Sequence, residues 1–485
     1  AVAGYRLQGD DLLLAGADGR TTLRVGDGTA AGAGYRVVVA TALTGASRLV
    51  KTDLGTAVLT GENRYSGGTT IVAGTLQIGN GGTRGSILGD VENDGVLAFA
   101  RSDTSTFAGD VSGSGVVRQV GTGTTVLTGA LTHTGGTVIS AGTLQVGDGG
   151  TDGRLTGNVR NDDTLAFARS NRLTFSGDIT GSGVVRQIGT GTTIVTGTAA
   201  HTGGTVITAG TLQIGNGGTR GSLGGDVRND GTLAFNRSDA IVFSGNITGT
   251  GALRQDGSGA TVLTGAATHT GGTVISAGML VVGDGGRNGR LAGDVDNDSV
   301  LAFNRAGRMT FAGDITGIGT VRQIGSGTTV LTGAATHTGT TLISDGALHV
   351  GNGGTRGFLS GDVQNDSVLA FDRSDEVTFS GALRGIGVLR QIGTGTTVLT
   401  GAATHTGGTV VAAGTLQIGD GGSRGSLSGD VENDGTLAFN RADDVTFAGT
   451  ISGAGAVQQI GTGTTTLAGV NTYSGGPLVS AGRLV

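Results

Sequence analysis

Short runs of alternating apolar and polar residues, each introduced by a glycine, recur along the whole chain. The clearest is the run 74–78, in which Leu76 and Ile78 alternate with Thr75 and Gln77. Successive side chains of a strand point to opposite faces, so a period of two places both aliphatic residues on one face. The run therefore predicts a β-strand with one buried and one exposed face.

Two further runs of the same kind follow at 95–99 and 115–119. Leu97 and Phe99 occupy the inward positions of the first, whereas the polar Gln119 occupies one in the second. Short strands joined by glycine-rich corners at such regular spacing are typical of a parallel β-solenoid. The inward Gln119 predicts a bulge or a shifted frame in that strand.

A longer period contains these runs, because the whole pattern returns as a 68-residue repeat. The first glycine of its most regular stretch stands at Gly67, Gly135, Gly203, Gly271, Gly339, Gly407 and Gly475. Six complete repeats occupy residues 67–474, and a partial seventh repeat occupies 475–485. Each repeat is predicted to form three coils of ~23 residues, and the whole chain about 21 coils.

The fold expected from this pattern is all-β, a parallel β-helix in which stacked coils share one core. The repeat frame is present from residue 45, so residues 45–485 are interpreted as a β-helix of 68-residue repeats. Residues 1–44 contain similar short strands between Gly and Asp turns. They are interpreted as irregular N-terminal turns of the same solenoid.

Phenylalanine marks the predicted interior, since 12 of the 13 phenylalanines occupy two positions of the repeat. In a solenoid such residues are expected to form internal stacks, each burial being worth about 1.5–3 kcal/mol. The two sets are Phe99, Phe167, Phe235, Phe303, Phe371 and Phe439, and Phe107, Phe175, Phe243, Phe311, Phe379 and Phe447.

An asparagine followed by an aspartate marks a predicted corner in every complete unit. Both side chains bond their own backbone and tolerate left-handed dihedral angles, so they suit a tight turn. This chemistry explains the recurrence without a binding site. The asparagines are Asn93, Asn161, Asn229, Asn297, Asn365 and Asn433.

Composition agrees with a folded β-protein and excludes several functions. There are 102 glycines and one proline, but also many Thr, Val, Ile and Leu residues, which suit a pleated, half-buried surface. The formal net charge of −6 leaves no basic stripe for nucleic acid. The chain has no cysteine, which excludes disulfides and thiolate metal sites and suits export through a narrow pore. No apolar run approaches the ~20 residues of a membrane helix.

The repetition of the candidate groups argues against a catalytic role for them. Five histidines (His133, His201, His269, His337 and His405) share one repeat position, which Tyr65 and Tyr473 fill in the terminal copies. A zinc ligand or general base would not readily be exchanged for tyrosine, so a structural role is favoured. His349 lies off this frame. Aspartates recur in most units, whereas an enzyme needs its site once. We therefore predict no catalytic residue, no metal site and no cofactor.

The stretch 67–76 (Gly-Gly-Thr-Thr-Ile-Val-Ala-Gly-Thr-Leu) closely resembles the autotransporter-associated β-strand repeat, also called the passenger-associated transport repeat. The flanking Tyr65-Ser66 and its copy Tyr473-Ser474 extend the resemblance, which covers about residues 45–485. It implies a right-handed parallel β-helix, secreted through type V secretion across a Gram-negative outer membrane by a C-terminal β-barrel of the same precursor. Barrel-type strands do not follow the repeats here.

Function is predicted from this resemblance and from the multiplicity of units. The leading hypothesis is a non-enzymatic, surface-displayed stalk that acts as an adhesin or by self-association, as in aggregation and biofilm formation. Its expected partners are copies of itself on neighbouring cells, or host surface receptors and matrix, and its expected location is the bacterial cell surface. The alternative is a carrier stalk for an enzymatic head, a protease or esterase, lying outside this chain.

Overall fold

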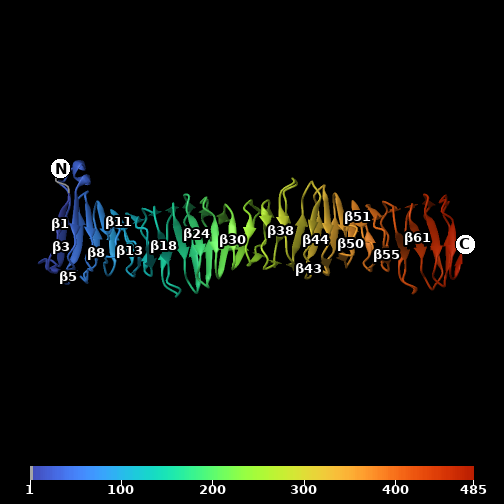
Figure 1. The fold of residues 1–485 in the computed structure, drawn as a ribbon, viewed down its shortest axis with the longest axis horizontal. Helices are drawn as coiled ribbons and strands as arrows, with labels where there is room; N and C mark the ends of the chain where they lie inside the picture. The colour runs from blue at the N-terminus through green and yellow to red at the C-terminus, as the bar shows by residue number, and fades with distance from the viewer. Residues whose placement is uncertain (1–3) are drawn as a thin grey trace. The chain divides into compact units, whose positions relative to one another are not determined.

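The computed structural model describes residues 4–485 and consists almost entirely of short parallel strands (Figure 1). The strands run from β1 (Tyr5–Leu7) to β67 (Arg483–Leu484), with a short 3-10 helix, η1 (Ala30–Gly34), near the start. The predicted fold class is confirmed, because the strands stack as a parallel β-solenoid of about 22 coils. Its right-handedness stays a prediction, in line with the general hand of parallel crossovers.

The solenoid divides into two compact units, residues 4–237 and 238–485. In the first unit the N-terminal strands stack on those of the repeats: β3 (Arg20–Arg24) pairs with β6 (Arg48–Thr52), and β4 (Arg36–Val39) pairs with β7 (Thr56–Leu59). The domain boundary at residue 44 stays a prediction, and residues 1–3 of that segment lie outside the described residues.

The stacking register follows the runs read from the sequence. Strand β9 (Thr75–Ile78) pairs in parallel with β11 (Val96–Phe99), which pairs with β14 (Val116–Gln119). The strand stacked next on β14 is β17 (Thr137–Ile139), not the run that begins at Thr143. The third coil is therefore about as short as the first two.

The second to fifth repeats each contribute ten strands, whereas the first and the sixth contribute nine. In the second to fifth repeats most strands pair with the strand three places further on, as β17 does with β20 and β20 with β23, so one coil holds three strands. The second repeat contains β17 (Thr137–Ile139), β18 (Thr143–Val146), β19 (Arg154–Leu155), β20 (Val159–Asn161), β21 (Thr164–Phe167), β22 (Arg172–Phe175), β23 (Ile179–Thr180), β24 (Val184–Gln187), β25 (Thr192–Val195) and β26 (Thr198–Ala199).

Ten strands at three per coil make three and one third coils, so the prediction of three coils per repeat is wrong. The reason is that the coils are shorter than predicted, while a glycine-rich loop such as 147–153 adds length without adding a strand. Equivalent strands of consecutive repeats must then lie one third of a turn apart around the solenoid axis.

The sheets show this rotation in each unit. In the first unit β9, β18 and β28 (Thr211–Ile214) are equivalent, yet they belong to three different sheets. In the second unit the equivalent strands β38 (Met279–Val282), β48 (Ala347–Val350) and β58 (Thr415–Ile418) likewise belong to three different sheets. A feature that occurs once per repeat therefore faces three directions in turn within each unit.

The phenylalanines lie inside but form pairs rather than continuous stacks. The Phe99 and Phe107 rings, each 4% exposed, have their centroids 5.4 Å apart at an interplanar angle of 51°. Along the column of stacked residues, Phe99 has Ile78 before it and Gln119 after it. Equivalent pairs have centroid distances of 5.5–5.9 Å in the repeats containing Phe167, Phe303, Phe371 and Phe439. The one-third rotation separates successive pairs, which is why the expected stacks do not form.

The inward Gln119 is accommodated in a regular strand, and the predicted bulge is wrong. All four residues of β14 pair in register with β11. The fully buried Gln119 amide donates from Nε2 to the carbonyl oxygens of Gly121 at 2.8 Å and Gly123 at 3.3 Å. Its Oε1 accepts a hydrogen bond from Thr125 Oγ1 at 2.7 Å. A buried polar side chain with partners on both ends needs no backbone irregularity.

The asparagines also differ from the corner role that the sequence predicts. Asn93 ends β10 (Val91–Asn93) on its inner face, is fully buried, and donates from Nδ2 to the carbonyl oxygen of Val116 at 3.1 Å. Asp94 accepts from the backbone N–H of Ser114 at 2.9 Å. Both bonds run to the following coil instead of to the residues' own turn, because the coils stack closely enough for short side chains to bridge them. Asn161, Asn297, Asn365 and Asn433 make the same bond to the following coil, and Asn365 also accepts the predicted bond from its own turn, from the backbone N–H of Ser367 at 3.3 Å.

A buried lysine, Lys51, stands one repeat before Gln119, at the position that glutamine fills in every complete repeat. Lys51 occupies the repeat position of Gln119, is 0% exposed, and donates from Nζ to the carbonyl oxygens of Thr52, Asp53 and Ala73 at 3.0, 2.7 and 3.1 Å. Burial lowers the pKa of Lys51 from 10.5 to about 8. Folding therefore disfavours its charge, a penalty that is full below pH 8 and is relieved as pH rises from 8 to 10.5.

Replacing this lysine by the residue of the other repeats should stabilise the first unit. We expect Lys51→Gln with Ala57→Thr, which recreates the pair of Gln119 and Thr125, to raise the free energy of unfolding at pH 7 by about 2 kcal/mol. Urea unfolding at pH 7 and pH 10 checks this: the wild type should gain stability toward pH 10, and the variant should not. Ala57→Thr alone is the control, and an equal gain from it would contradict the role of the lysine charge.

Candidate functional site

The most exposed repeated feature is a glycine-rich loop, here called the corner loop, that occurs once per repeat. In the first, 79–85, the ends meet: a Cβ on Gly85 would lie 2.6 Å from the backbone nitrogen of Gly79. Residues 80–84 between them are all exposed. The other corner loops are 147–153, 215–221, 283–289, 351–357 and 419–425.

An arginine that recurs once in every complete repeat holds the end of the corner loop. Arg101 donates from Nη1 to the carbonyl oxygen of Gly85 at 3.0 Å and forms a two-pronged ion pair with Asp103, at 2.8 and 2.7 Å. This hydrogen bond to Asp103 raises the pKa of Arg101 and lowers the pKa of Asp103. The equivalent bonds to the loop end come from Arg169, Arg305, Arg373 and Arg441. Sequence reasoning missed this residue, although its place in the repeat was a sufficient signal.

Removing one such arginine should free its loop. Arg373 binds the carbonyl oxygen of Gly357 and pairs with Asp375 at 2.8 and 2.7 Å, with only 12% of its side chain exposed. We expect Arg373→Ala to cost about 2 kcal/mol and to speed tryptic cleavage after Arg356 in the loop. Limited proteolysis with mass spectrometry measures the cut. The control is Arg384→Ala, an exposed arginine of β53 (Leu383–Arg384), and equal cleavage in both variants would contradict the clamp.

The repeated histidines are buried beside the glycine corner. The His133 side chain is 1% exposed, and its Nε2 lies 3.1 Å from the carbonyl oxygen of Gly136 and 3.2 Å from Thr137 Oγ1. A carbonyl only accepts, so Nε2 carries the proton, and Nδ1 has no partner. Tyr65 takes this place in the first copy, with its hydroxyl 2.7 Å from Thr69 Oγ1, and burial raises the pKa of Tyr65 to about 12.

Burial lowers the pKa of all five repeated histidines, and that of His337 falls to about 4. The off-frame His349 is half-buried on β48 between Val330 and Ala370, and its pKa is lowered by burial and by Arg308 and Arg390, against an opposing effect of Asp372. Within residues 4–485, no three His, Asp or Glu side chains stand close enough to hold a metal ion.

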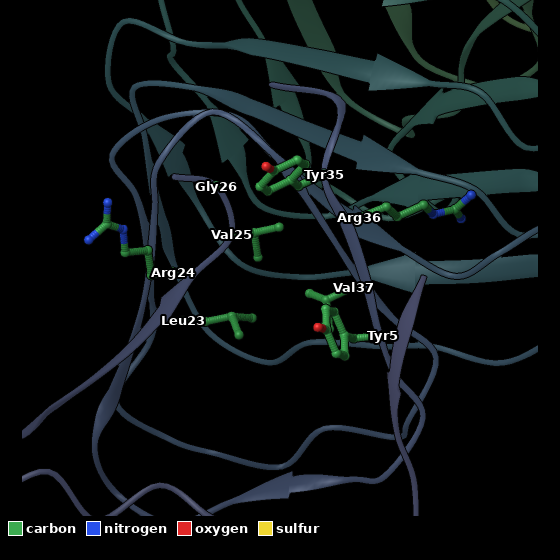
Figure 2. A pocket seen from close by; sticks show the side chains of 8 residues that line it. All are labelled: Tyr5, Leu23, Arg24, Val25, Gly26, Tyr35, Arg36 and Val37. Atoms are coloured by element: carbon green, nitrogen blue, oxygen red, sulfur yellow. The ribbon is translucent and has the colours of Figure 1, made fainter. Parts of the chain in front are cut away.

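A cavity of about 400 Å³ lies among the first strands of the first unit (Figure 2). Figure 2 shows the aliphatic Leu23, Val25 and Val37 pointing toward its centre, with the ring of Tyr35 above them. Arg24 is paired with Asp53 at 3.1 Å, and Arg36 donates to Asn80 Oδ1 at 2.6 Å. The lining, completed by Tyr5 and Gly26, contains no carboxylate, histidine or hydroxyl nucleophile of Ser or Thr. Tyr5, Arg24 and Arg36 of this lining are exposed, so the cavity lies at the edge of the core and not inside it.

Comparison with known families agrees with this geometry. The passenger-associated-transport-repeat family matches the chain seven times, at residues 49–78, 117–146, 185–214, 253–282, 321–350, 389–418 and 457–485. The chain is thus an autotransporter passenger β-solenoid built of passenger-associated transport repeats. Each match spans the strands on either side of a glycine corner, and successive matches lie one repeat apart.

A relative among well-described proteins is the adhesin BmaC autotransporter of Brucella suis biovar 1 (strain 1330). The two are 34% identical over 552 aligned residues, which include all of this chain but only 16% of the relative. No solved structure matches the chain. Among residues 4–485, no helix is long and apolar enough to cross a membrane.

Proposed function

We propose that this chain is the non-enzymatic attachment region of a surface-displayed autotransporter passenger. The observation that carries the proposal is the display of one exposed corner loop per repeat, in three directions within each unit. Many weak contacts of one kind can together bind strongly when they engage a common surface. The name of the relative, an adhesin, supports the same function.

The partners proposed for this region are surface receptors or matrix of a host, or copies of the same protein on neighbouring cells. The region reaches the cell surface through an outer-membrane barrel of its own precursor. A stalk that carries a protease or esterase head outside this chain is the alternative. The repeated loops and the name of the relative favour attachment.

Bead attachment tests the proposal directly. Polystyrene beads coated with the purified chain should adhere to one another or to a cell monolayer. Deleting residues 135–202, one whole repeat in frame, should weaken adhesion in part, and deleting residues 339–406 as well should weaken it further. Circular dichroism confirms that each variant is folded. Complete loss of adhesion after one substitution at a non-repeated surface residue would contradict a multivalent mechanism.

A further inference from the structure

Two kinds of corner loop alternate along the six repeats. Loops 79–85, 215–221 and 351–357 share one sequence, Gly-Asn-Gly-Gly-Thr-Arg-Gly, and are here called the arginine loops. Loops 147–153, 283–289 and 419–425 have an aspartate in place of the asparagine. The aspartate places a carboxylate in each of these three loops, even in 419–425, which also carries Arg424.

The arginines of the arginine loops, Arg84, Arg220 and Arg356, are all exposed. Among the described residues, none of these three side chains forms an ion pair with a carboxylate. Their loops themselves contain no acidic residue. Each guanidinium is therefore free to bind an external anion.

A second arginine reaches two of the arginine loops from elsewhere in the first unit. Arg172 donates from Nη2 to Asn216 Oδ1 at 2.8 Å, and Arg36 donates to Asn80 Oδ1 at 2.6 Å. An amide oxygen accepts these bonds without cancelling the charge of the guanidinium. The second arginine therefore adds to the positive field at the loop.

We propose that the arginine loops bind acidic polysaccharide, through the carboxylate or sulfate groups of the polymer. This rests on the proposed attachment function and names the chemistry of its partner. A guanidinium forms paired, charge-assisted hydrogen bonds with such groups, and the neighbouring backbone N–H groups and Asn side chains suit sugar hydroxyls. Glu62, which accepts from the backbone N–H of Gly85 at 3.2 Å, weakens the positive field at the first loop, so loop 215–221 binds more strongly.

The shape of the partner follows from the rotation between repeats. The two arginine loops of the first unit, 79–85 and 215–221, are two repeats apart and therefore lie on different faces. Six and two thirds coils at ~4.8 Å per coil separate them by about 32 Å along the axis. A flat, rigid surface meets only one direction at a time. A flexible polysaccharide chain can pass from one face to the next, and several chains can bind different faces of one unit.

Binding of the purified chain to immobilised heparin, alginate and neutral dextran tests the proposal. The wild type is expected to bind heparin, alginate or both, more weakly as salt rises, and not dextran. Arg84→Gln, Arg220→Gln and Arg356→Gln combined should lower the affinity at least tenfold. The matched control is Arg118→Gln, Arg186→Gln and Arg390→Gln combined, which removes the same charge from exposed strand positions and should retain wild-type affinity.

Equal losses in the two triple variants, or no binding to either acidic polymer, would overturn the proposal. So would a loop variant that loses only self-association in sedimentation, since the loops would then bind another copy of the chain. Bead adhesion separates this result from the proposed function. Beads that adhere without any polysaccharide binding leave attachment standing and refute the polysaccharide. Polysaccharide binding without bead adhesion leaves the polysaccharide proposal standing and refutes attachment.

Discussion

Acidification from pH 6.5 to pH 4 should unfold the solenoid in a steep transition that the buried histidines cause. Burial lowers the pKa of each repeated histidine below 6.5, so the unfolded chain takes up protons first as the pH falls. The contribution of neutral imidazole to the free energy of unfolding is full above pH 6.5 and is lost as the pH falls toward the folded-state pKa. For His337, with a folded pKa of about 4, the loss is about 3 kcal/mol.

The other four histidines add losses of the same sign. Protonation at Nδ1 would create a buried charged donor that has no partner, since that atom is unpaired in all five residues. Urea unfolding followed by circular dichroism at pH 7, 5.5 and 4 measures the effect. The slope of stability against pH should correspond to the uptake of more than one proton.

The chain itself supplies the control for this prediction. Tyrosine occupies the histidine position at Tyr65 and bonds Thr69 there, so the His→Tyr exchange suits the site. A variant with all five histidines replaced by tyrosine should lose much less stability between pH 7 and pH 4, because only His349 then remains as a histidine with a lowered pKa. The lowered pKa values of carboxylates such as Asp94 and Asp430 act mainly below pH 4, and Glu62 adds a small loss near pH 4.5, so the upper part of the window belongs to the histidines. An unchanged pH profile in the variant would contradict the role of the histidines.

Adding one methyl group between two coils should destabilise the second unit by about 3 kcal/mol or more. A Cβ on Gly381 would lie well under 3.0 Å from the carbonyl oxygen of Gly361 in the preceding coil, and 3.0 Å from Cζ of Phe379. Because these contacts are with backbone and a buried ring, Gly381→Ala must push coils apart and weaken their hydrogen bonds. Thermal unfolding of the wild type and variant measures the loss.

The control for this substitution is another glycine of the same unit. Gly354 lies in a corner loop, where a Cβ would meet only Asn352 Oδ1 at 3.6 Å. Gly354→Ala should therefore change the free energy of unfolding by less than about 1 kcal/mol. Similar losses in the free energy of unfolding for the two variants would show that glycine is needed for local backbone flexibility and not for close contact between coils.

Much of the fold could be predicted because stacking repeats the local pattern. The alternation in 74–78 and 95–99 predicts the inward Leu76 and Phe99, and the spacing of the two runs matches the observed pairing of β9 with β11. The polar interior could not be predicted in the same way. The partner of Asn93 is a backbone group of the following coil, which becomes a neighbour only when the coils stack. The partners of Gln119 lie only two and four residues further along the chain, but alternation does not show that the backbone turns there so that an inward amide reaches their carbonyl oxygens.

By itself, the sequence determined the 68-residue period, the parallel solenoid and the inward residues of its strands, because alternation and spacing are local properties of a chain. Only the tertiary structure decided that ten strands at three per coil make three and one third coils. Strands as short as β19 and β23 cannot show alternation, and a glycine-rich run has the same composition in a corner as in a projecting loop. The rotation of successive corner loops follows from strand pairing, and pairing is a property of the stacked coils.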